Sequence, residues 1–525
     1  MIRKLHTLLP FLAFLGILDS FYLSYEHFFE ILPPCSTNLL FLDCGKVLSS
    51  PYSIVLGIPL AYIGLLHYVI EWSFLISSLR TKSSLIKRTA LILTFIGFGS
   101  SLYFVFLQLF VIGAICLYCM TSALISLILF FIALSVFSRE RKEIIVAILH
   151  FTYVHLVKPL LFKINPEFVH ESMTSFGYFL GKFNWIKHTI SYFLRYENPM
   201  LSQTIAGIEF KNPIGLAAGF DYEAKITQIS SSISFGFQSV GTITHKAYGG
   251  NPKPMLGRLP KSKSLMVNKG FKNMGAKKTI EKLESLSLPR RRESIQITKG
   301  FPIGVSIGKT NTLSIKTQRE AVEDIISSFT LFEQSRVHHA YYELNISCPN
   351  LKGTISFYPP KNLEQLLTAI DKLKLTRPLF IKMPIEKTDR EIVRMLEVIT
   401  KHKVTGIIIG NLQKDRSNPV LQPDEVAQFP TGNFSGKPCF ERSNHLINLT
   451  YQKYKKRFII IGCGGVFSTK DAYLKIKLGA SLVQLITGMI FEGPQLIADI
   501  NLKLPKLLEK DGFKNISEAI GTQKF

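Results

Sequence analysis

The chain has 525 residues, which predicts about two or three domains rather than one. Residues 1–140 are far more apolar than the rest, so a wholly water-soluble organisation is excluded. The formal net charge is +25. Many Lys and Arg residues flank apolar runs and no nucleic-acid-binding module accompanies them. We therefore expect contact with anionic lipid and an anionic cofactor, and no nucleic-acid partner.

Four long apolar runs follow one another in the first quarter of the chain. They cover residues 7–28, 53–78, 89–113 and 117–137. Each exceeds the roughly 17 residues that a helix needs to cross hydrocarbon. The first run has no clear small-residue cleavage site and is followed by further runs, so it is not a simple signal peptide. We predict a four-helix transmembrane bundle over residues 1–142.

Basic residues indicate how this bundle lies in the membrane. They precede the first run, join the second to the third and follow the fourth: Arg3, Lys4, Arg80, Lys82, Lys87, Arg88, Arg139, Arg141 and Lys142. The loop at 29–52 carries only Lys46 as a basic residue. Because Lys and Arg concentrate on the cytoplasmic side, we predict a multi-pass protein of the cell inner membrane with both termini inside. The loop at 29–52 and the turn at 113–118 then face outward.

Four cysteines lie on this predicted outer face: Cys35, Cys44, Cys116 and Cys119. The last two form a Cys-x-x-Cys at the start of the fourth run. A thiolate is stabilised at a helix N-terminus, and the second cysteine of such a pair can resolve a mixed disulfide. We therefore favour a redox pair. The alternatives are two structural disulfides, or a metal site, which the absence of His from that loop disfavours.

Residues 5–137 resemble the vitamin K epoxide reductase family. The resemblance rests on the loop cysteine pair, on "CGKVLSSPYSIVLGIPLAYIG" (44–64) and on "CLYC" at the mouth of the fourth run. It implies that the Cys-x-x-Cys pair faces a quinone inside the bundle and that the loop pair passes electrons inward. Ser50 would lie near the quinone head. No thioredoxin-like domain follows, so the electron donor would be a separate periplasmic thioredoxin-like dithiol protein.

The segment 143–200 is amphipathic and contains "EIIVAILHFTYVHLVKPLLFKI". It is either a linker helix packed on its neighbour or a pair of helices in the lipid interface. The stretch "LLFKINPEFVHESM" (160–173) favours the second interpretation. It resembles the N-terminal segment of the membrane-associated, class 2 dihydroorotate dehydrogenases. In that family two such helices form a hydrophobic tunnel that admits quinone to a flavin.

The remaining residues, 201–525, alternate short apolar strands with helical stretches. The strand candidates are 213–217, 237–242, 302–308, 342–347, 378–383, 405–411, 457–463 and 481–487. Eight such strands over this length predict a (β/α)8 TIM barrel. Gly, Asn, Ser and Lys residues end nearly every strand, and a barrel builds its active site at that rim. We therefore expect these scattered residues to converge.

Several strand ends carry specific chemistry. "GCGG" (462–465) and "TG" (487–488) follow strands seven and eight, the usual phosphate site of such barrels. "SGKP" (435–438) is expected on the loop after strand six, closing over a cofactor. Lys382 ends strand five and needs an anion, which a reduced flavin would supply. Cys348 follows strand four in "NISCPN" and is either a general base or a small buried hydrophobic residue.

Residues 146–505 resemble the dihydroorotate dehydrogenases. The matching motifs are "NPIGLAAGFD" (212–221), "GTIT" (241–244), "NISCPN" (345–350), "IKM" (381–383), "SGKP", "GCGG" and "LVQLITG" (482–488). The resemblance implies FMN as cofactor and no metal. It implies oxidation of dihydroorotate to orotate, in which a base takes a C5 proton and the C6 hydride passes to the flavin. Class 2 members then pass the electrons to quinone.

The resemblance also implies individual roles. FMN would contact Ala218, Gly219, Thr242, Asn345, Lys382, Gly436, Gly464, Gly465, Thr487 and Gly488. The substrate would contact Phe271, Asn345, Asn350 and Asn411. Cys348 would be the base, although class 2 members carry serine there and cysteine is the class 1 residue.

The departures from the family pattern cluster around the substrate. A lysine is replaced by Tyr222 and an asparagine by Val267, while Leu351 and Leu412 replace threonines and Ser306 an asparagine. Losing a lysine and an asparagine costs several kcal/mol at about 1.5–3 kcal/mol for each charged hydrogen bond. Lys269 or Asn268 could compensate by local rearrangement.

Three hypotheses follow. The leading one is a fusion of two quinone-linked redox modules that draw on the same membrane quinone. The second keeps FMN but changes the substrate to another acid, because the substrate positions are altered. The third is a non-catalytic FMN-binding scaffold held at the membrane by its apolar helices.

Overall fold

The computed structural model describes residues 2–31, 33–35, 42–81, 83–287, 300–455 and 457–523. The chain divides into two compact units, Met1–Ile145 and Val146–Phe525. Lys82, which contributes to the predicted membrane orientation, lies outside the described residues.

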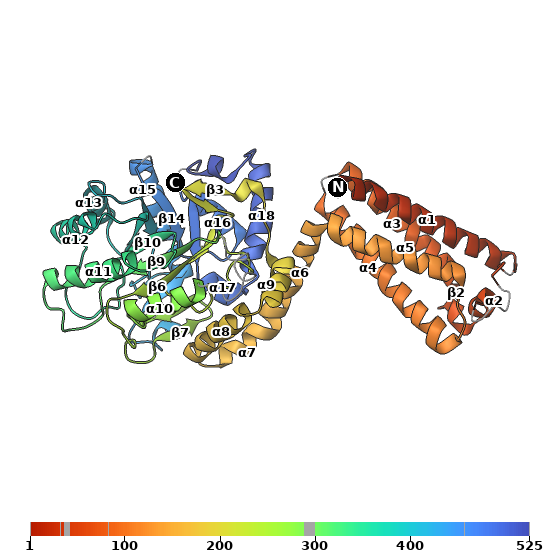
Figure 1. The fold of residues 1–525 in the computed structure, drawn as a ribbon, viewed down its shortest axis with the longest axis horizontal. Coiled ribbons are helices and arrows are strands. Elements are labelled where there is room, and N and C mark those ends of the chain that lie inside the picture. The colour runs from red at the N-terminus through yellow and green to blue at the C-terminus, as the bar shows by residue number, and fades with distance from the viewer. Residues whose placement is uncertain are drawn as a thin grey trace. The chain divides into compact units, whose positions relative to one another are not determined.

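The first unit is helical (Figure 1). Its long helices are α1 (Ile2–Phe28), α3 (Leu60–Arg80), α4 (Ser84–Phe106, continued as a π-helix over Leu107–Ile112) and α5 (Leu117–Val136). Helices α1 and α4 each pack on both α3 and α5. A Cβ atom built on Gly16 would lie 2.5 Å from the Tyr68 ring. Small residues therefore let these helices approach closely, as is usual between helices in a membrane.

The second predicted run begins later than expected, at Leu60 instead of residue 53. Residues before it form a 3₁₀ turn (Pro51–Ser53) and a hairpin of β1 (Ile54–Val55) and β2 (Ile58–Pro59). Pro59 occupies the N-cap of α3. Because proline lacks an N–H and is tolerated only in the first turn of a helix, the apolar composition of 53–59 does not extend α3 backwards.

Residues 138–194 are helical throughout most of their length. They form α6 (Ser138–Thr152), a π-helical turn (Tyr153–Val157), α7 (Lys158–Lys163), α8 (Pro166–Gly181) and α9 (Asn184–Leu194). Among the described residues, five helices are long and apolar enough to cross a membrane, and the fifth is the continuous stretch Ser138–Lys163. The Tyr153 hydroxyl donates to the Ile490 carbonyl (2.7 Å), so this stretch also contacts α17 (Thr487–Glu492).

The second unit contains a closed parallel barrel, as predicted (Figure 1). In order around the barrel, its strands are β5 (Ile214–Leu216), β6 (Phe237–Ile243), β9 (Ile303–Ile307), β10 (Tyr341–Asn345), β11 (Leu379–Met383), β12 (Gly406–Ile409), β14 (Ile459–Cys463) and β15 (Leu482–Leu485). Each overlaps one predicted strand, with ends that differ by no more than two residues. The helices that follow the strands include α10 (Ala276–Ser287), α11 (Gln318–Glu333), α12 (Pro360–Lys372), α13 (Asp389–Ile399), α15 (Phe440–Tyr454), α16 (Thr469–Lys477) and α18 (Leu496–Lys510).

The amino-terminal end of the barrel is filled by aromatic rings set opposite glycines. Gly304 of β9 pairs with Tyr341 of β10, and a Cβ atom on Gly304 would lie 2.2 Å from the Tyr341 ring. Gly215 faces Phe237 in the same way, at 2.3 Å. Large and small residues thus alternate around one layer of the barrel, and this end is packed solid.

The prediction for "SGKP" was wrong in one respect, because Ser435 and Gly436 are not in a loop. They belong to β13 (Asn433–Gly436), which pairs antiparallel with β8 (Ser264–Val267), itself paired with β7 (Leu256–Leu259). Strand β8 pairs with β7 on one side, and its other edge has backbone groups available for pairing. Residues 433–436 form backbone hydrogen bonds to that edge and therefore become a strand.

The glycine–aromatic layer gives a stability prediction. Gly304→Ala should lower the free energy of unfolding by about 1–3 kcal/mol, because the added methyl group must displace the Tyr341 ring. Thermal unfolding followed by circular dichroism measures the change. Gly249→Ala is the matched control, since nothing lies within 4 Å of its Cβ position. Equal stability of Gly304→Ala and the unmodified chain would contradict this packing.

Candidate active sites in the two units

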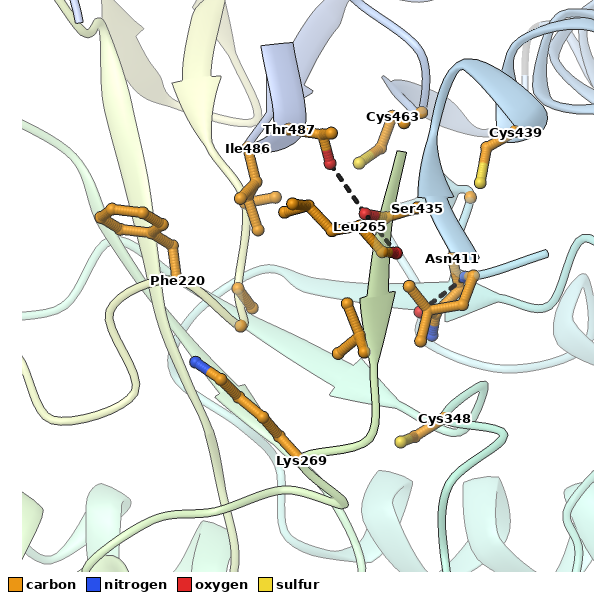
Figure 2. A pocket seen from close by; sticks show the side chains of 18 of the residues that line it. Phe220, Leu265, Lys269, Cys348, Asn411, Ser435, Cys439, Cys463, Ile486 and Thr487 are labelled. Carbon is orange, nitrogen blue, oxygen red and sulfur yellow. Dashed lines mark hydrogen bonds between the residues drawn. The ribbon is translucent and has the colours of Figure 1, made fainter. Parts of the chain in front are cut away.

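The rim of the barrel encloses a cavity that gathers the predicted residues (Figure 2). It is lined by Ala218, Gly219, Thr242, Phe271, Asn345, Cys348, Asn350, Lys382, Asn411, Gly436, Gly464, Gly465, Thr487 and Gly488, together with other residues. Every barrel residue predicted to bind cofactor or substrate therefore lines one cavity. The carboxyl ends of the parallel strands bring them together, as the fold requires.

A buried polar network supports the wall around Lys382. The Asn345 amide donates to the Thr242 hydroxyl (2.8 Å), which lies 3.1 Å from the Ser306 hydroxyl. Ser306 in turn donates to Glu343 (3.0 Å). The Asn345 side-chain oxygen also accepts from the Ser347 N–H (3.3 Å) and the Ser347 hydroxyl (3.2 Å), so the orientation of this amide is fixed.

Sequence reasoning missed Glu343, which is fully buried on β10. Its Oε1 lies 3.6 Å from Lys382 Nζ, so the anion that Lys382 was expected to meet is already present in the protein. Burial works to lower the pKa of Lys382, but attraction to Glu343 leaves that pKa raised. A lone acid two residues before Asn345, on the same face of the strand, was the signal that could have identified it.

Two further amides of the cavity are held by hydrogen bonds. The Asn411 amide donates to the Ser347 hydroxyl (2.6 Å), and the Asn350 amide donates to the Val267 carbonyl (2.9 Å). The Ser435 and Thr487 hydroxyls lie 2.8 Å apart, as the dashed line in Figure 2 shows. The cavity therefore presents several fixed hydrogen-bonding groups.

The Cys348 side chain lines the same cavity, on the loop after β10 (Figure 2). Burial raises the pKa of the Cys348 thiol to about 12, although the backbone N–H of Asn350 and the charge of Lys382 act in the opposite direction. At neutral pH the group is therefore a protonated thiol, and its thiolate is a strong base when it forms.

Tyr222 stands where the dihydroorotate dehydrogenases have a lysine, and its side chain contacts Glu171 of α8. The Tyr222 hydroxyl donates to Glu171, which also accepts from Lys225 and Lys272, each at 2.9 Å. Burial opposes ionisation, but these hydrogen bonds hold the pKa of Glu171 well below its usual range. The sequence analysis interpreted residues 160–173 only as part of a quinone tunnel and did not identify Glu171 as a residue of the site.

Lys269 is the cation that remains unpaired at this wall. Its Nζ lies 4.5 Å from the centre of the Tyr222 ring, and no hydrogen bond or ion pair reaches it from the described residues. Burial lowers the pKa of Lys269 to about 7. Asn268, the other candidate for compensation, accepts a hydrogen bond from Asn251 (3.0 Å) and does not line the cavity.

Glycines form the part of the wall expected to hold a phosphate. Gly464 and Gly465 have positive φ angles of 107° and 73°. A Cβ atom on Gly465 would lie 2.5 Å from Phe440, and one on Gly488 would lie 1.9 Å from the Val466 carbonyl oxygen. Only glycine fits these positions, so the backbone itself forms the surface of the cavity there.

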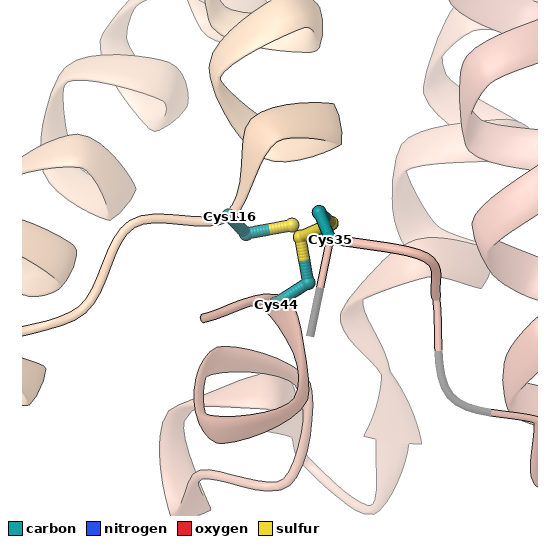
Figure 3. Close-up of side chains that lie close together, drawn as sticks. All are labelled: Cys35, Cys44 and Cys116. Carbon is teal, nitrogen blue, oxygen red and sulfur yellow. A yellow bond between two sulfur atoms is a disulfide. The ribbon is translucent and has the colours of Figure 1, made fainter. Parts of the chain in front are cut away.

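In the first unit, three sulfur atoms lie together (Figure 3). Cys35 and Cys44 form a disulfide, with their Cα atoms 5.5 Å apart. The Cys116 Sγ lies within 4.8 Å of both sulfurs. Cys116 and Cys119 are free thiols, and the Cys119 N–H donates to Cys116 Sγ at 3.5 Å. The arrangement suits thiol–disulfide exchange better than metal binding, because a disulfide offers no thiolate ligand.

A second cavity lies beside these cysteines, within the helices of the first unit. Its mainly apolar wall includes Cys119, Ser50, His67, Tyr68 and Gln108. The side-chain oxygen (Oε1) of Gln108 accepts a hydrogen bond from the Cys116 N–H (2.8 Å), which fixes the start of α5. The structure therefore brings Ser50 and Cys119 to one cavity, as the family resemblance implies.

The closed parallel barrel with a cavity at its carboxyl rim has the architecture of (β/α)8-barrel enzymes. The dihydroorotate dehydrogenase family model matches residues 200–508, and the vitamin K epoxide reductase family model matches residues 7–134. The dihydroorotate dehydrogenase (quinone) of Christiangramia forsetii is 36% identical over 366 residues, covering 68% of this chain and 99% of that protein. The corresponding protein of Nostoc punctiforme is 32% identical over 381 residues, covering 71% and 98%.

A crystal structure of dihydroorotate dehydrogenase from Eimeria tenella in complex with ferulenol has a similar fold. Its TM-score is 0.59 and its sequence identity 28%, over 68% of this chain and 95% of that chain. The chain therefore belongs to the dihydroorotate dehydrogenase family and carries an N-terminal vitamin K epoxide reductase family domain. Both families are oxidoreductases.

The burial of Cys348 gives a pH prediction. A pKa of about 12 leaves a thiolate fraction of about 10⁻⁴ at pH 8, so iodoacetamide should label Cys348 slowly there and faster as pH rises toward 12. Mass spectrometry of the peptide that contains Cys348 measures the rate. The urea-unfolded chain is the control and should react at the rate of a free cysteine. Rapid labelling of the folded chain at pH 7 would contradict the burial argument.

Proposed function

We propose that the barrel binds FMN and oxidises dihydroorotate to orotate, and that the electrons pass on to a membrane quinone. The observation that carries this proposal is the convergence of fixed amides, Lys382, Cys348 and a glycine-lined wall in one cavity. The relatives named dihydroorotate dehydrogenase (quinone) support the same reaction.

The residues of the cavity fit FMN. Gly464, Gly465 and Gly488 leave room for a phosphate against their backbone. Lys382 offers a donor to the polar edge of a flavin ring. When bound, FMN supplies the acceptor for the hydride that leaves C6 of the substrate.

The protein's own residues would hold the substrate and move its proton. Asn345, Asn350 and Asn411 line one cavity and offer amides to the ring carbonyl and N–H groups of dihydroorotate. The Cys348 thiolate would take the C5 proton and become a thiol, while the C6 hydride leaves with its electron pair. Because its pKa is raised, this thiolate is scarce at neutral pH but strongly basic.

Lys269 would bind the carboxylate of the substrate. It lines the cavity, lies over the Tyr222 ring and has no anionic partner among the described residues, whereas Lys272 and Lys225 are both paired with Glu171. The positive charge lost at position 222 is thus replaced from the loop after β8. This supports an organic acid as substrate.

We also propose that the first unit oxidises protein thiols and reduces quinone at the outer face of the cell inner membrane. The sulfur cluster and the adjacent apolar cavity support this reaction. Two thiols of an external dithiol protein would reduce the Cys35–Cys44 disulfide. The resulting thiols would reduce a Cys116–Cys119 disulfide. Reoxidation of that pair would then pass two electrons to the quinone and release two protons, and the quinone would take up two protons to become a hydroquinone.

The sidedness follows from the placement of Lys and Arg. We propose that α6 and α7 lie in the cytoplasmic lipid interface and do not span the membrane. The Arg258 guanidinium donates to the Ile164 carbonyl (2.6 Å), and Tyr153 contacts α17, so this stretch is held by the barrel unit. The barrel then faces the cytoplasm.

Flavin reduction tests the barrel proposal. Under anaerobic conditions, dihydroorotate should bleach the flavin absorbance of the purified chain, while other organic acids of similar size should not. Cys348→Ala should bind FMN equally well but be reduced about 10²–10⁴ times more slowly, because it lacks the base. A flavin that another acid reduces and dihydroorotate does not would favour a different substrate. A chain without flavin would overturn the proposal.

The pKa of Lys269 predicts a pH dependence of substrate binding. Its pKa is lowered to about 7, so Lys269 is protonated below pH 7 and loses its charge as pH rises through 7. The dissociation constant for orotate, measured from the flavin spectrum, should therefore increase above pH 7. Lys269→Met should weaken binding about 10–100-fold and remove this dependence. Lys272→Met is the control, and a larger effect of that variant would contradict the assignment.

Thiol labelling tests the outer module. With a reduced dithiol protein and quinone present, Cys119→Ser should stop quinone reduction but leave the Cys35–Cys44 disulfide reducible by the partner. Maleimide labelling followed by mass spectrometry counts the free thiols. Orotate formation by the barrel serves as the control for folding and should be unchanged. Quinone reduction at the normal rate by Cys119→Ser would contradict the proposal.

A further inference from the structure

A histidine and a glutamate lie inside the first unit, next to the cavity that contains Cys119. Glu71, in the middle of α3, has a relative exposure of 1%, although α3 is long and apolar enough to span a membrane. His67 lies one helical turn earlier, with its Nε2 3.7 Å from Glu71 Oε2. Ionisable groups inside a membrane helix are costly and are retained mainly for function.

The two side chains differ in their access to the cavity. His67 lines its wall, together with Cys119 and Ser50, whereas Glu71 lies behind His67 and is not part of the wall. No hydrogen-bond partner for Glu71 Oε1 lies among the described residues. The pair is therefore not saturated by structural hydrogen bonds, as a purely architectural pair would be.

The neighbouring helix leaves space for this histidine. A Cβ atom on Gly97 of α4 would lie 2.7 Å from His67 Nε2, so any larger residue would displace the ring. Gly97 lines the same cavity. The packing thus holds the imidazole between the cavity and Glu71.

We propose that His67 and Glu71 form a proton relay that serves quinone reduction in this cavity. The proposal rests on the thiol-oxidising, quinone-reducing function proposed for the first unit. His67 donates a proton to a quinone oxygen, and Glu71 transfers its proton to His67. With one mobile proton, the pair has two forms: neutral His67 with protonated Glu71, or protonated His67 with ionised Glu71. Both forms have zero net charge, so proton transfer between the two side chains brings no net charge into the membrane.

Protons and electrons balance as follows. Cys116 and Cys119 form a disulfide and release two electrons and two protons. The quinone accepts both electrons, one proton from the thiols and one from His67, and becomes a hydroquinone. The second thiol proton leaves to water at the outer face. Because only His67 of the pair lines the cavity, Glu71 is reprotonated through His67 from water that enters the cavity between turnovers.

Leu75 and Ser78 follow Glu71 on the same stripe of α3, and the Ser78 hydroxyl lies 2.9 Å from His6 Nε2. Leu75 is fully buried and separates Glu71 from these polar groups. The relay is therefore a local pair at the cavity and not a continuous chain of polar groups through the unit.

Single-turnover kinetics test the relay. The full chain in lipid nanodiscs is reduced with dithiothreitol, freed of reductant and mixed with a short-chain benzoquinone. Quinone absorbance and maleimide-labelled free thiols are followed together, and flavin absorbance normalises for folded protein. Glu71→Gln and His67→Gln should slow both signals about 10-fold or more, with little change in the quinone concentration at half-saturation. Glu71→Asp should recover part of the rate.

Two control variants make the outcome specific. Glu26→Gln removes another buried carboxyl, on α1, that does not line the cavity, and should react normally. Asp19→Asn removes a carboxyl on the same helix whose charge acts on both Cys116 and Cys119. Three results would each overturn the relay. The first is a normal rate in Glu71→Gln, and the second is equal slowing in Glu26→Gln. The third is loss of the reaction in Asp19→Asn but in none of the other variants. If the unmodified chain fails to couple thiol oxidation to quinone, the function proposed for the first unit fails and the relay with it.

Discussion

Closure of the parallel barrel is the constraint on which the rest of the second unit depends. Each strand pairs with its neighbours in a fixed parallel register, so all eight carboxyl ends meet at one rim. Asn345 and Lys382 are direct partners in the pairing of β10 and β11. Residues separated by more than 200 positions in the sequence, such as Thr242 and Thr487, thereby line one cavity. At the opposite end, glycines pack against the rings of Phe237 and Tyr341.

Charge pairing explains which polar groups are structural and which are available for chemistry. Lys382 is paired with Glu343, and Glu171 binds Tyr222, Lys225 and Lys272. Lys269 differs, because its ammonium group faces a cavity without an anionic partner among the described residues. An unpaired charge in a half-buried position is costly, and that cost is offset when a ligand supplies the opposite charge. The same reasoning identifies the half-satisfied His67–Glu71 pair in the first unit.

Much of this organisation could be predicted from the sequence. Short apolar runs bounded by Gly, Asn and Pro marked all eight barrel strands, because backbone closure leaves few other arrangements for such a pattern. The resemblance to the motifs of the dihydroorotate dehydrogenases also pointed to residues that line the cavity. The start of α3 was misplaced, because an apolar run does not reveal that Pro59 ends a hairpin. The strand character of Ser435 and Gly436 depends on pairing with the distant β8, which no local signal encodes.

The contributions of α8 were the least predictable part of the site. Glu171 and His170 reach the barrel rim from a helix more than 30 residues before the first barrel strand, and they act through tertiary contacts with Tyr222. The altered residues at 222 and 267 looked like losses in the sequence. In the structure, the Tyr222 ring positions Lys269 and the Val267 carbonyl orients Asn350. Local sequence shows which residues change but not which neighbours replace their function.

The central claim is that the barrel passes electrons from dihydroorotate to a membrane quinone. The most direct measurement is the stoichiometry of the complete reaction, with the full chain in lipid, no thiol donor and no oxygen present. The account predicts one quinone consumed for each orotate formed. Orotate formation without loss of quinone, or quinone loss without orotate, would contradict it.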